Sequence, residues 1–159
     1  MTLAAAGRAQ TMDFTASRTE FTFWCMWSSP LLIDTDLRNL TVQKRSIIAN
    51  AEAISINQDG GFGAADRLSN ASSGAQVWAR PLQGGDLAVV LYNSHSLNSV
   101  EISVSWEELH LPAGLAMSVR DVWAGRADPV ARGRLSATVA PRDVKWVRLR
   151  PAKVWLDLV

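Results

Sequence analysis

The sequence of 159 residues contains a single cysteine, Cys25, and only two histidines, His95 and His110. One cysteine excludes an intrachain disulfide, and it excludes a metal site built from several thiolates. The histidines stand apart in polar segments, without a cysteine or a carboxylate at the spacing that metal ligands show. We therefore expect no metal and no other cofactor.

The chain also lacks an excess of charge of either sign, with 16 basic and 15 acidic residues and a formal net charge of +1. This balance gives no electrostatic reason to expect nucleic acid or an anionic membrane as a partner. The longest apolar run, residues 21–33, is interrupted by two serines and a proline and is shorter than the ~20 residues of a transmembrane helix. Residues 1–10 lack the apolar core of a signal peptide, so we expect none here, and the compartment stays open.

Apolar residues are plentiful, at 48% of the chain against 19% charged residues, which is enough for a buried core. The length indicates about one domain, or one domain and a piece of another. The clearest signal is Leu87 to Tyr92, where every position is apolar. A strand with no polar face belongs in the middle of a sheet, with packing on both sides.

Residues 76–82 predict the partner of this strand in a β-hairpin. The turn Gly84-Gly85-Asp86 supplies the positive φ values that a tight reversal needs. Pro81 cannot donate a ladder hydrogen bond, so we expect this end of the partner strand to be irregular or unpaired on one side.

The first third of the chain predicts helices around a short strand. Residues 1–14 are expected to be irregular. Ser17-Arg18-Thr19-Glu20 has the form of a capping box, so a helix is expected to begin there and to end at Pro30. Leu31-Leu32-Ile33 predicts a short strand of the kind found in parallel sheets that are covered on both faces.

A second helix is expected over residues 41–50, and its apolar pattern continues toward residue 57. Ile47, Ala51 and Ile54 fall on one stripe at helical spacing. The first third therefore predicts a helix, a parallel-type strand and a second helix.

The composition changes after residue 58, because residues 59–75 are rich in glycine, serine and asparagine, as in a linker. Strand signals then alternate with turn signals, at residues 100–106, 117–123, 134–139 and 144–150. Several short strands at this spacing predict an antiparallel β-sandwich. The fold class that we expect is therefore α+β.

Asp34 and Asp36 are a pair of carboxylates that invites a catalytic interpretation. They leave the predicted strand at i and i+2, about 6.6 Å apart at ~3.3 Å per residue, and glycosidases hold two carboxyls about 5 to 9.5 Å apart. Neighbours on one strand point in parallel, however, whereas catalytic carboxylates approach a bond from opposite sides. The alternative is a turn in which Asp36 lies near Arg38 and caps the next helix. We assign no catalytic residue.

Other candidate residues have simple structural explanations. Cys25 sits in an apolar helix with no histidine near it in sequence, which favours a buried, inert thiol over a nucleophile. Glu107-Glu108 is the pattern of a solvated turn. Aromatic faces suit sugar rings, but tryptophans at strand positions are more often part of a core, and this applies to Trp78, Trp106, Trp123 and Trp146.

Two sequons are present, Asn39-Leu40-Thr41 and Asn70-Ala71-Ser72. Asn70 lies in a predicted loop, where a glycan has room. Sequons also arise by chance, so Asn39 and Asn70 are candidate glycosylation sites only if the protein is secreted.

Several segments resemble, in the same order, one family of enzymes, glycoside hydrolase family 27, the α-galactosidase and α-N-acetylgalactosaminidase family. The match runs from about Arg18 to Pro151, which is most of the chain. The segments that carry it are EFTFWCMWSSPLLI at 20–33, DLRNLT at 36–41, EAISINQD at 52–59, VWARPL at 77–82 with GGD at 84–86, AVVLYN at 88–93 and SVRDVWA at 118–124.

The resemblance implies an arrangement of domains. The first part would be the seventh helix, eighth strand and eighth helix of a (β/α)8 barrel, and the rest would be a C-terminal antiparallel β-sandwich. The boundaries that we expect are an irregular N-terminus at 1–14, the barrel remnant at 15–58, a linker at 59–75, the β-sandwich at 76–151 and a tail at 152–159.

The resemblance also implies a reaction, the retaining hydrolysis of terminal α-D-galactosides by an aspartate nucleophile and an aspartate acid/base. In the family both aspartates lie upstream of the seventh helix, in a K-x-D segment and a W-N-D-P-D-M-type segment, and this sequence contains neither. We therefore expect no glycosidase activity from this chain alone, and a longer native protein or a truncated product. A complete protein that follows its family would be secreted, lysosomal or vacuolar, and could be a homodimer.

Three hypotheses for function remain open. The first is the C-terminal part of an α-galactosidase-like glycosidase, with an α-galactoside as the partner of the complete protein. The second is a non-catalytic β-sandwich module that binds carbohydrate or is purely structural. The third is a degenerate product that does not fold alone.

Overall fold

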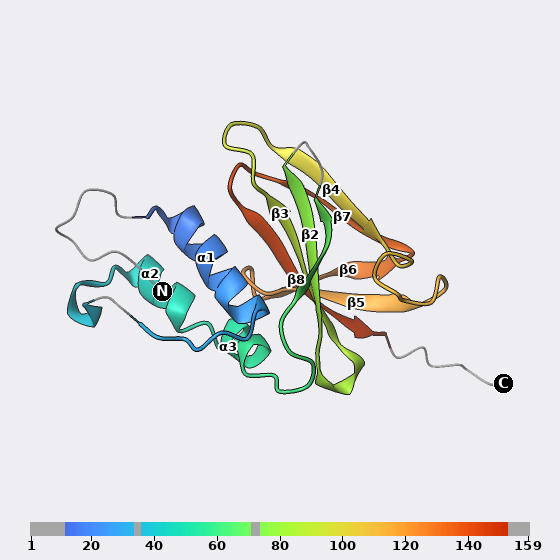
Figure 1. The fold of residues 1–159 in the computed structure, drawn as a ribbon, viewed down its shortest axis with the longest axis horizontal. Helices are drawn as coiled ribbons and strands as arrows, with labels where there is room; N and C mark the ends of the chain where they lie inside the picture. Colours follow the sequence, from blue (N-terminus) through green and yellow to red (C-terminus); the bar gives the residue numbers. More distant parts are fainter. Residues whose placement is uncertain (1–11, 34–35, 71–73, 153–159) are drawn as a thin grey trace.

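A computed structural model of the protein describes residues 12–33, 36–70 and 74–152. Helices come first along the chain and strands follow (Figure 1). The helical elements are α1 (Phe14–Met26), the 3₁₀ turn η1 (Leu37–Asn39), α2 (Val42–Ile48) and α3 (Ala51–Asn57). The strands are β1 (Asp66–Asn70), β2 (Ala75–Pro81), β3 (Leu87–Asn93), β4 (Val100–Ser105), β5 (Ala116–Asp121), β6 (Arg126–Arg132), β7 (Arg134–Val139) and β8 (Val144–Pro151), with the 3₁₀ turn η2 (Gln83–Gly85) between β2 and β3.

The strands form two antiparallel sheets. The larger has six strands in the order β1-β2-β3-β8-β5-β6, and the smaller pairs β4 with β7. Side chains of β4 and β7 share one apolar cluster with one face of the larger sheet, while α1, α2 and α3 share a second cluster with its other face. Figure 1 shows the helices on one side of the larger sheet. The expected fold class, helices followed by an antiparallel β-sandwich, is confirmed.

Strand β3 is buried on both faces, as predicted. Val89 and Leu91 face β4 and β7, whereas Ala88 and Val90 face the helices, and all four are fully buried. The alternation arises because successive side chains of a strand point to opposite faces. One strand therefore contributes to both apolar clusters.

The hairpin of β2 and β3 is also confirmed. Gly84 and Gly85 have φ values of 77° and 81°, which residues with a Cβ rarely adopt. Pro81 pairs with Leu87 on β3, while the ladder between β1 and β2 reaches only as far as Ala79. This end of β2 is thus unpaired on the β1 side, as the proline predicted.

Helix α1 begins earlier than predicted. Asp13 is the N-cap, and its Oδ1 accepts a hydrogen bond of 2.7 Å from the backbone N–H of Ala16. The predicted capping box, residues 17–20, lies inside the helix, and Ser17 is fully buried there. The prediction was wrong because Asp13, which lies four residues upstream of Ser17 and is an equally good cap, already satisfies the helix terminus.

The predicted strand at residues 31–33 does not form. The backbone N–H of Leu32 donates to the carbonyl of Pro30, and the side chain of Leu32 is 72% exposed. A parallel strand needs a neighbour to receive its hydrogen bonds, and none pairs with these residues in the described part of the chain. The prediction of a strand covered on both faces was wrong, because Leu32 and Ile33 of this apolar run are exposed.

The second predicted helix is divided in two at Asn50. The side chain of this residue accepts from the backbone N–H of Ala53 and so caps a new helix, α3. The break turns the chain, so that Ile47, Ala53 and Ile56 are buried in place of the predicted stripe through Ala51 and Ile54.

Two strands were not predicted. Strand β1 lies within the segment expected to be a linker, and β6 lies in a segment with no apolar alternation. Both are edge strands of the larger sheet, mostly exposed, so neither carries the pattern of a half-buried strand. The domain boundaries given above stay a prediction.

Candidate functional site

The candidate functional site is the junction where α1 and α3 meet the larger sheet. Its centre is Arg80 of β2, which is fully buried. Its Nη1 donates to the carbonyl oxygens of Cys25, at 3.1 Å, and Ile56, at 2.5 Å, and its Nη2 donates to that of Asp59 at 2.6 Å. Cys25 is near the C-terminal end of α1 and Ile56 near that of α3.

This geometry matches a cation to two helix ends. The last carbonyls of a helix have no partner within it and carry partial negative charge. The guanidinium of Arg80 supplies donors to both ends at once. Burial lowers the pKa of Arg80 and the nearby charge of Asp59 opposes that shift, so the side chain remains charged at neutral pH.

Asn57 extends this connection. Its side-chain Nδ2 donates to the backbone carbonyls of Trp24, at 3.2 Å, and Ser29, at 2.9 Å. The backbone carbonyl of Asn57 accepts from the hydroxyl of Ser28. The side chain is buried. Asn57 and Arg80 together fix the end of α1 against α3 and β2.

The other end of α1 is held by polar contacts to the turn before β8. The guanidinium of Arg18 pairs with the carboxylate of Asp143, and the hydroxyl of Thr19 donates to the carbonyl of Arg142. In addition, Trp123 Nε1 donates to the hydroxyl of Thr22 at 3.0 Å. Helix α1 is therefore fixed to the sheet at both ends.

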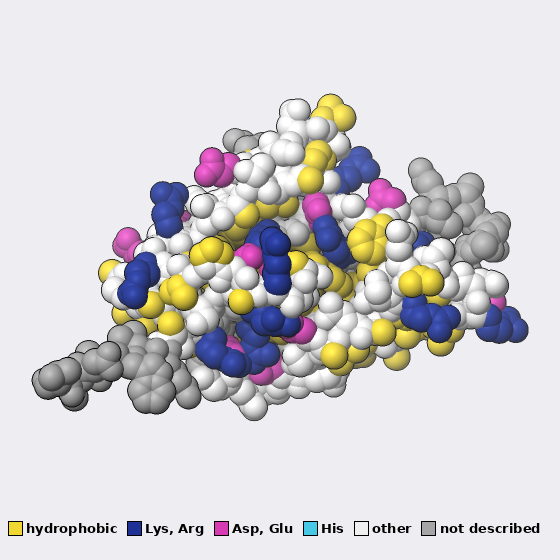
Figure 2. Space-filling view, turned by 180° about the vertical axis from the view of Figure 1, so that it is seen from behind, with side chains coloured by type: hydrophobic (Ala, Val, Ile, Leu, Met, Phe, Trp, Pro, Cys, Tyr) yellow, Lys and Arg dark blue, Asp and Glu magenta, His cyan; other side chains and the backbone are white. Residues whose placement is uncertain are grey.

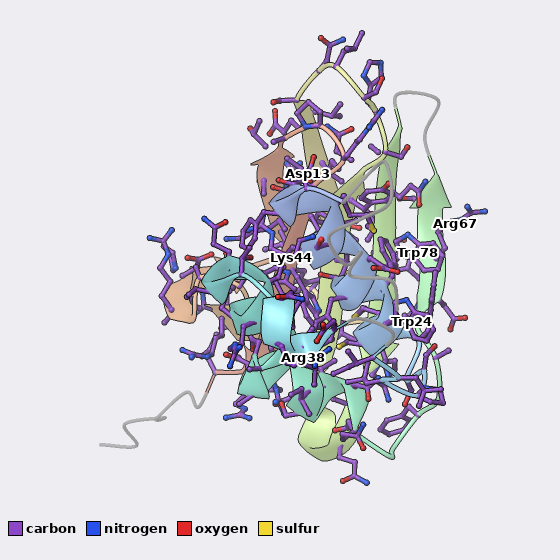
Figure 3. The ribbon with its side chains drawn as sticks, turned by 90° about the vertical axis from the view of Figure 1, so that its left-hand side faces the viewer. Asp13, Trp24, Arg38, Lys44, Arg67 and Trp78 are labelled. Atoms are coloured by element: carbon purple, nitrogen blue, oxygen red, sulfur yellow. The ribbon has the colours of Figure 1, made fainter. Side chains whose placement is uncertain are left out.

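Aromatic side chains fill the junction between these polar contacts. Phe23 contacts Trp27, Trp78 and Tyr92 at ring-centroid distances of 5.2–5.4 Å. Trp78 on β2 has the guanidinium of Arg67, from β1, over its ring, and Figure 3 shows these two side chains side by side. The cluster packs helix against sheet, and only Trp27 in it is largely exposed.

The tryptophans considered for sugar stacking divide into two groups. Trp106 and Trp146 are fully buried, so neither has a ring face free for a sugar. Trp78 and Trp123 are half-buried and pack within the junction. The structure therefore favours the core interpretation for this set.

Large apolar side chains are exposed on the helical part of the molecule. Leu32 is 72% exposed and Val42 is 85% exposed. Phe14, Trp27, Ile33, Leu37 and Phe62 belong to the same set, which we call the exposed apolar set. A hollow of about 240 Å³ between η1 and α2 lies among them, lined by Leu37, Leu40, Arg45, Ile48 and Ala49. Where exposed apolar side chains form a contiguous patch, they commonly mark a surface on which another protein segment packs.

Of the two aspartates considered for catalysis, Asp34 lies outside the described residues. Asp36 is the N-cap of η1, and its carboxylate accepts from the backbone N–H and the Nε of Arg38. These hydrogen bonds from Arg38 hold the pKa of Asp36 below its usual value. The cap and ion pair that the sequence offered as the alternative is present.

Cys25 takes part in the packing of α1, and the two histidines lie between strands. The thiol of Cys25 is fully buried, and burial raises its pKa to about 12, so it is protonated at neutral pH. His95 Nδ1 accepts from the backbone N–H groups of Leu97 and Asn98, and His110 lies in a turn at φ 55°. In the part of the chain that the structure describes, no group of three or more His, Cys, Asp or Glu side chains is placed to hold a metal ion.

One small cleft, of about 140 Å³, has two carboxylates in its lining, Asp66 and Glu108. Glu108 Oε2 accepts from both the backbone N–H and the hydroxyl of Ser105, which hold the pKa of Glu108 below its usual value. A general acid in a glycosidase needs a raised pKa. The arrangement around Glu108 is that of a turn-forming carboxylate, in agreement with the sequence.

The two candidate glycosylation sites differ in position. Asn39 is exposed at the end of η1, and its Nδ2 donates to Asp36. Asn70 is the last residue of β1, and the two residues that complete its sequon lie outside the described residues. Glycosylation at either residue stays a prediction. None of the helices among residues 12–33, 36–70 and 74–152 has the length and hydropathy to cross a membrane.

Comparison with known families places this architecture. Residues 9–59 match the family model described as α-galactosidase A, and residues 72–149 match the model described as the α-galactosidase C-terminal β-sandwich domain. The α-galactosidase of Oryza sativa subsp. japonica is 37% identical over 134 residues, which cover 84% of this chain and 31% of the relative. This chain spans about a third of the length of the curated relatives that it matches.

Solved structures show the same fold. Crystalline α-galactosidase I from Mortierella vinacea superimposes with a TM-score of 0.83 at 23% identity, covering 94% of this chain and 39% of that one. A GH27 β-L-arabinopyranosidase from Geobacillus stearothermophilus also gives 0.83, at 24% identity, over 92% and 32% of the two chains.

Helices fixed to an antiparallel sandwich, together with the matches of both parts of the chain to α-galactosidase models, define the class as a fragment of a glycoside hydrolase. The chain belongs to glycoside hydrolase family 27, the α-galactosidase family, and corresponds to the C-terminal portion of its members.

Proposed function

We propose that this chain is the C-terminal portion of a retaining glycoside hydrolase that cleaves terminal α-D-galactosides. The observation that carries the proposal is the match of both parts of the chain, in order, to α-galactosidase models. The carbohydrate partner is thus an α-galactoside, bound by the complete protein. The two carboxylates of the retaining reaction, which lie about 5–5.5 Å apart in such enzymes, belong to the catalytic portion outside this sequence.

The role of this chain is to support that catalytic portion. In the proposal, the exposed apolar set on the helical part, including Leu32 and Val42, packs against it. Arg80 and Asn57 hold α1 and α3 on the sandwich, so that the sandwich and the catalytic portion keep one orientation. We also propose the domain division given above, with the barrel-type helices at 15–58 and the sandwich at 76–151.

A direct test is to compare two proteins. The purified 159-residue chain is expected to release no p-nitrophenol from p-nitrophenyl α-D-galactoside above the blank. A protein that also contains the reading frame upstream of Met1 is expected to include the K-x-D and W-N-D-P-D-M-type segments and to hydrolyse the same substrate. Turnover by the short chain, or an upstream frame without either segment, would contradict the proposal.

The sugar that is cleaved needs its own comparison, since one of the similar structures is a β-L-arabinopyranosidase. The longer protein should be assayed with p-nitrophenyl β-L-arabinopyranoside beside the α-galactoside. We expect a higher kcat/KM for the α-galactoside. Light scattering of both proteins then tests whether the exposed apolar set is covered by the catalytic portion or, in a homodimer, by a second copy.

A further inference from the structure

A second cleft lies on the larger sheet, beside the junction. It has a volume of about 410 Å³, and its lining includes three arginines, Arg120 of β5 and Arg148 and Arg150 of β8, together with Glu52 of α3. Side chains next to these arginines along the strands, such as Val119, belong to the apolar cluster inside the sandwich. The arginines therefore point to the opposite face of the sheet, the one that the helices cover in part.

Two of these arginines stand directly opposite each other. Arg120 and Arg148 are cross-strand partners in the ladder between β5 and β8. Like charges in such a position destabilise a sheet. Each of the two arginines pairs with a carboxylate of its own, which offsets the repulsion between them. Arg120 Nε donates to both oxygens of Glu52, at 2.9 and 2.8 Å, and Arg148 Nε donates to Asp86 at 2.6 Å.

Arg150 adds a third cation without adding a third acid. Its Nε and Nη2 donate to Asp86, which is thus shared by two arginines. Three guanidinium groups therefore face two carboxylates, and the group as a whole carries one excess positive charge. Figure 2 shows Lys and Arg side chains gathered with Asp and Glu on the face of the molecule seen from behind.

The two carboxylates are buried more deeply than the guanidinium groups that they pair with. The side chain of Asp86 is 4% exposed, against 23% and 65% for Arg148 and Arg150, and that of Glu52 is 18% exposed, against 49% for Arg120. Solvent therefore meets the guanidinium groups first. Among the hydrogen bonds of the described residues, both Arg120 and Arg148 use Nε alone, which leaves the Nη groups of the two for a ligand.

We propose that this cleft binds an oxyanion, and that the oxyanion is the carboxylate of an acidic sugar such as galacturonate. Paired guanidinium groups match the geometry of a carboxylate, a sulfate or a phosphate through parallel N–H donors. Ser118 adds a hydroxyl and Ala127 an apolar surface to the lining, which suit a sugar ring beside the anion. The sugar part of this inference rests on the proposed function, whereas the oxyanion part depends on the arginines alone.

The test is a titration of the ¹⁵N-labelled 159-residue chain followed by NMR, with sodium galacturonate, neutral galactose and sodium sulfate as separate ligands at constant ionic strength. Galacturonate is expected to shift the amide resonances of the cleft strands, and galactose is expected not to. Arg120→Gln and Arg148→Gln should each weaken binding at least about tenfold, because each removes a charge-assisted hydrogen bond. Arg132→Gln, an equal loss of charge at an exposed position of β6 outside the cleft, should leave binding unchanged.

Glu52→Gln is expected to strengthen the binding of the anion, in contrast to the arginine variants. It removes the acid that holds Arg120, so the anion is expected to bind several-fold more tightly. This variant keeps the size of the side chain, and circular dichroism of each variant shows whether it folds.

The outcomes separate the parts of the proposal. Sulfate binding with the same dependence on Arg120 and Arg148, but without galacturonate binding, keeps the oxyanion site and overturns the sugar as its source. Equal binding of galactose and galacturonate, binding that the arginine variants do not change, or no binding of either anion overturns the site itself. None of these measurements involves hydrolysis, so a failure here leaves the proposed glycosidase role to its own test.

Discussion

The helical region, residues 14–57, and the sheet region, residues 66–151, differ in how completely each buries its apolar residues. The sheet region encloses a cluster built from both sheets, with Leu91 and Trp106 inside it. The helical region buries one side against the larger sheet and leaves Leu32 and Val42 in solvent on another. The sandwich thus has an apolar core of its own, whereas the helices bury apolar side chains only on the side that faces the larger sheet. In the proposed function, the exposed side of the helical region is the side that packs against the catalytic portion.

The largest effect is expected where the two regions are joined. Arg80→Met keeps the length of the side chain but removes the three hydrogen bonds that the guanidinium donates to the carbonyls of Cys25, Ile56 and Asp59. The carbonyls of Cys25 and Ile56 then keep only the longer bonds, of 3.2 and 3.3 Å, from nearby backbone N–H groups. A hydrogen bond from a charged donor contributes about 1.5–3 kcal/mol, so losing three of them should lower the free energy of unfolding by about 3–5 kcal/mol. Urea unfolding followed by circular dichroism measures this.

Arg132→Met serves as the control for the junction variant, because Arg132 is exposed on edge strand β6. We expect a change within about 0.5 kcal/mol there. If Arg80→Met costs less than about 1 kcal/mol, water replaces the guanidinium, and Arg80 does not join the two regions as described.

The next effect tests the self-contained core of the sheet region. Leu91→Ala removes a fully buried side chain between β3 and the smaller sheet, and it should cost about 3 kcal/mol through lost burial and the cavity that remains. Leu97→Ala, in the exposed loop after β3, is the matched control and should change stability little. Equal transition midpoints for the two variants in urea would rule out a packed sandwich core.

A third effect concerns pH. Burial alone would raise the pKa of Asp86, but hydrogen bonds from Arg150 and Arg148 outweigh it and hold the pKa below its usual value. A lowered carboxyl pKa stabilises the fold above the unfolded value and loses that contribution as the pH falls through the folded value. Stability should therefore decline as the pH falls below ~4.

Asp86→Asn should cost about 2 kcal/mol at pH 7 and should flatten that decline, in urea titrations repeated from pH 7 to about 2. Asp36→Asn is the control, since its partner Arg38 is 89% exposed and ion pairs at the surface contribute little. If the stability of Asp86→Asn still falls with pH as steeply as that of the wild type, other carboxylates cause the decline.

The smallest effect on stability, and the sharpest contrast between the regions, is expected for the exposed apolar set. Leu32→Ser combined with Val42→Ser should change the free energy of unfolding by less than about 1 kcal/mol, because neither side chain is buried. The same variant should bind less of the dye ANS and aggregate more slowly than the wild type. Leu97→Ser replaces an exposed leucine of the sheet region and should change neither ANS binding nor the rate of aggregation. An equal change in this variant would show that the exposed apolar side chains of the two regions behave alike.

The sheet region was largely predictable from the sequence because its strands carry period-two patterns. The alternation through Ile102 and Val104, and through Leu135 and Val139, identified β4 and β7, and the unbroken apolar run identified β3 as a central strand. Strand β6 was missed because most of its side chains are exposed and Pro129 lies in the middle. An edge strand takes its conformation from its neighbour, and that information is not local.

The helical region and the junction were less predictable. The capping box at 17–20 was a valid local pattern, but Asp13 lay in a segment without periodicity and was overlooked. The apolar residues 31–33 could not show that a strand lacks a neighbour. Arg80 looked like an ordinary polar position of a hairpin, since its three carbonyl partners lie 21 to 55 residues away in sequence.

The contacts between α1 and the turn before β8 have a consequence for how the protein is made. Arg18 meets Asp143 across 125 residues of sequence, and Thr19 meets Arg142 across 123. A ribosome releases α1 long before it makes β8, so α1 cannot complete these contacts until more than a hundred further residues have been synthesised. Such long-range closure slows folding and exposes the nascent chain to aggregation. Efficient production in cells should therefore depend on chaperones that shield α1 during translation.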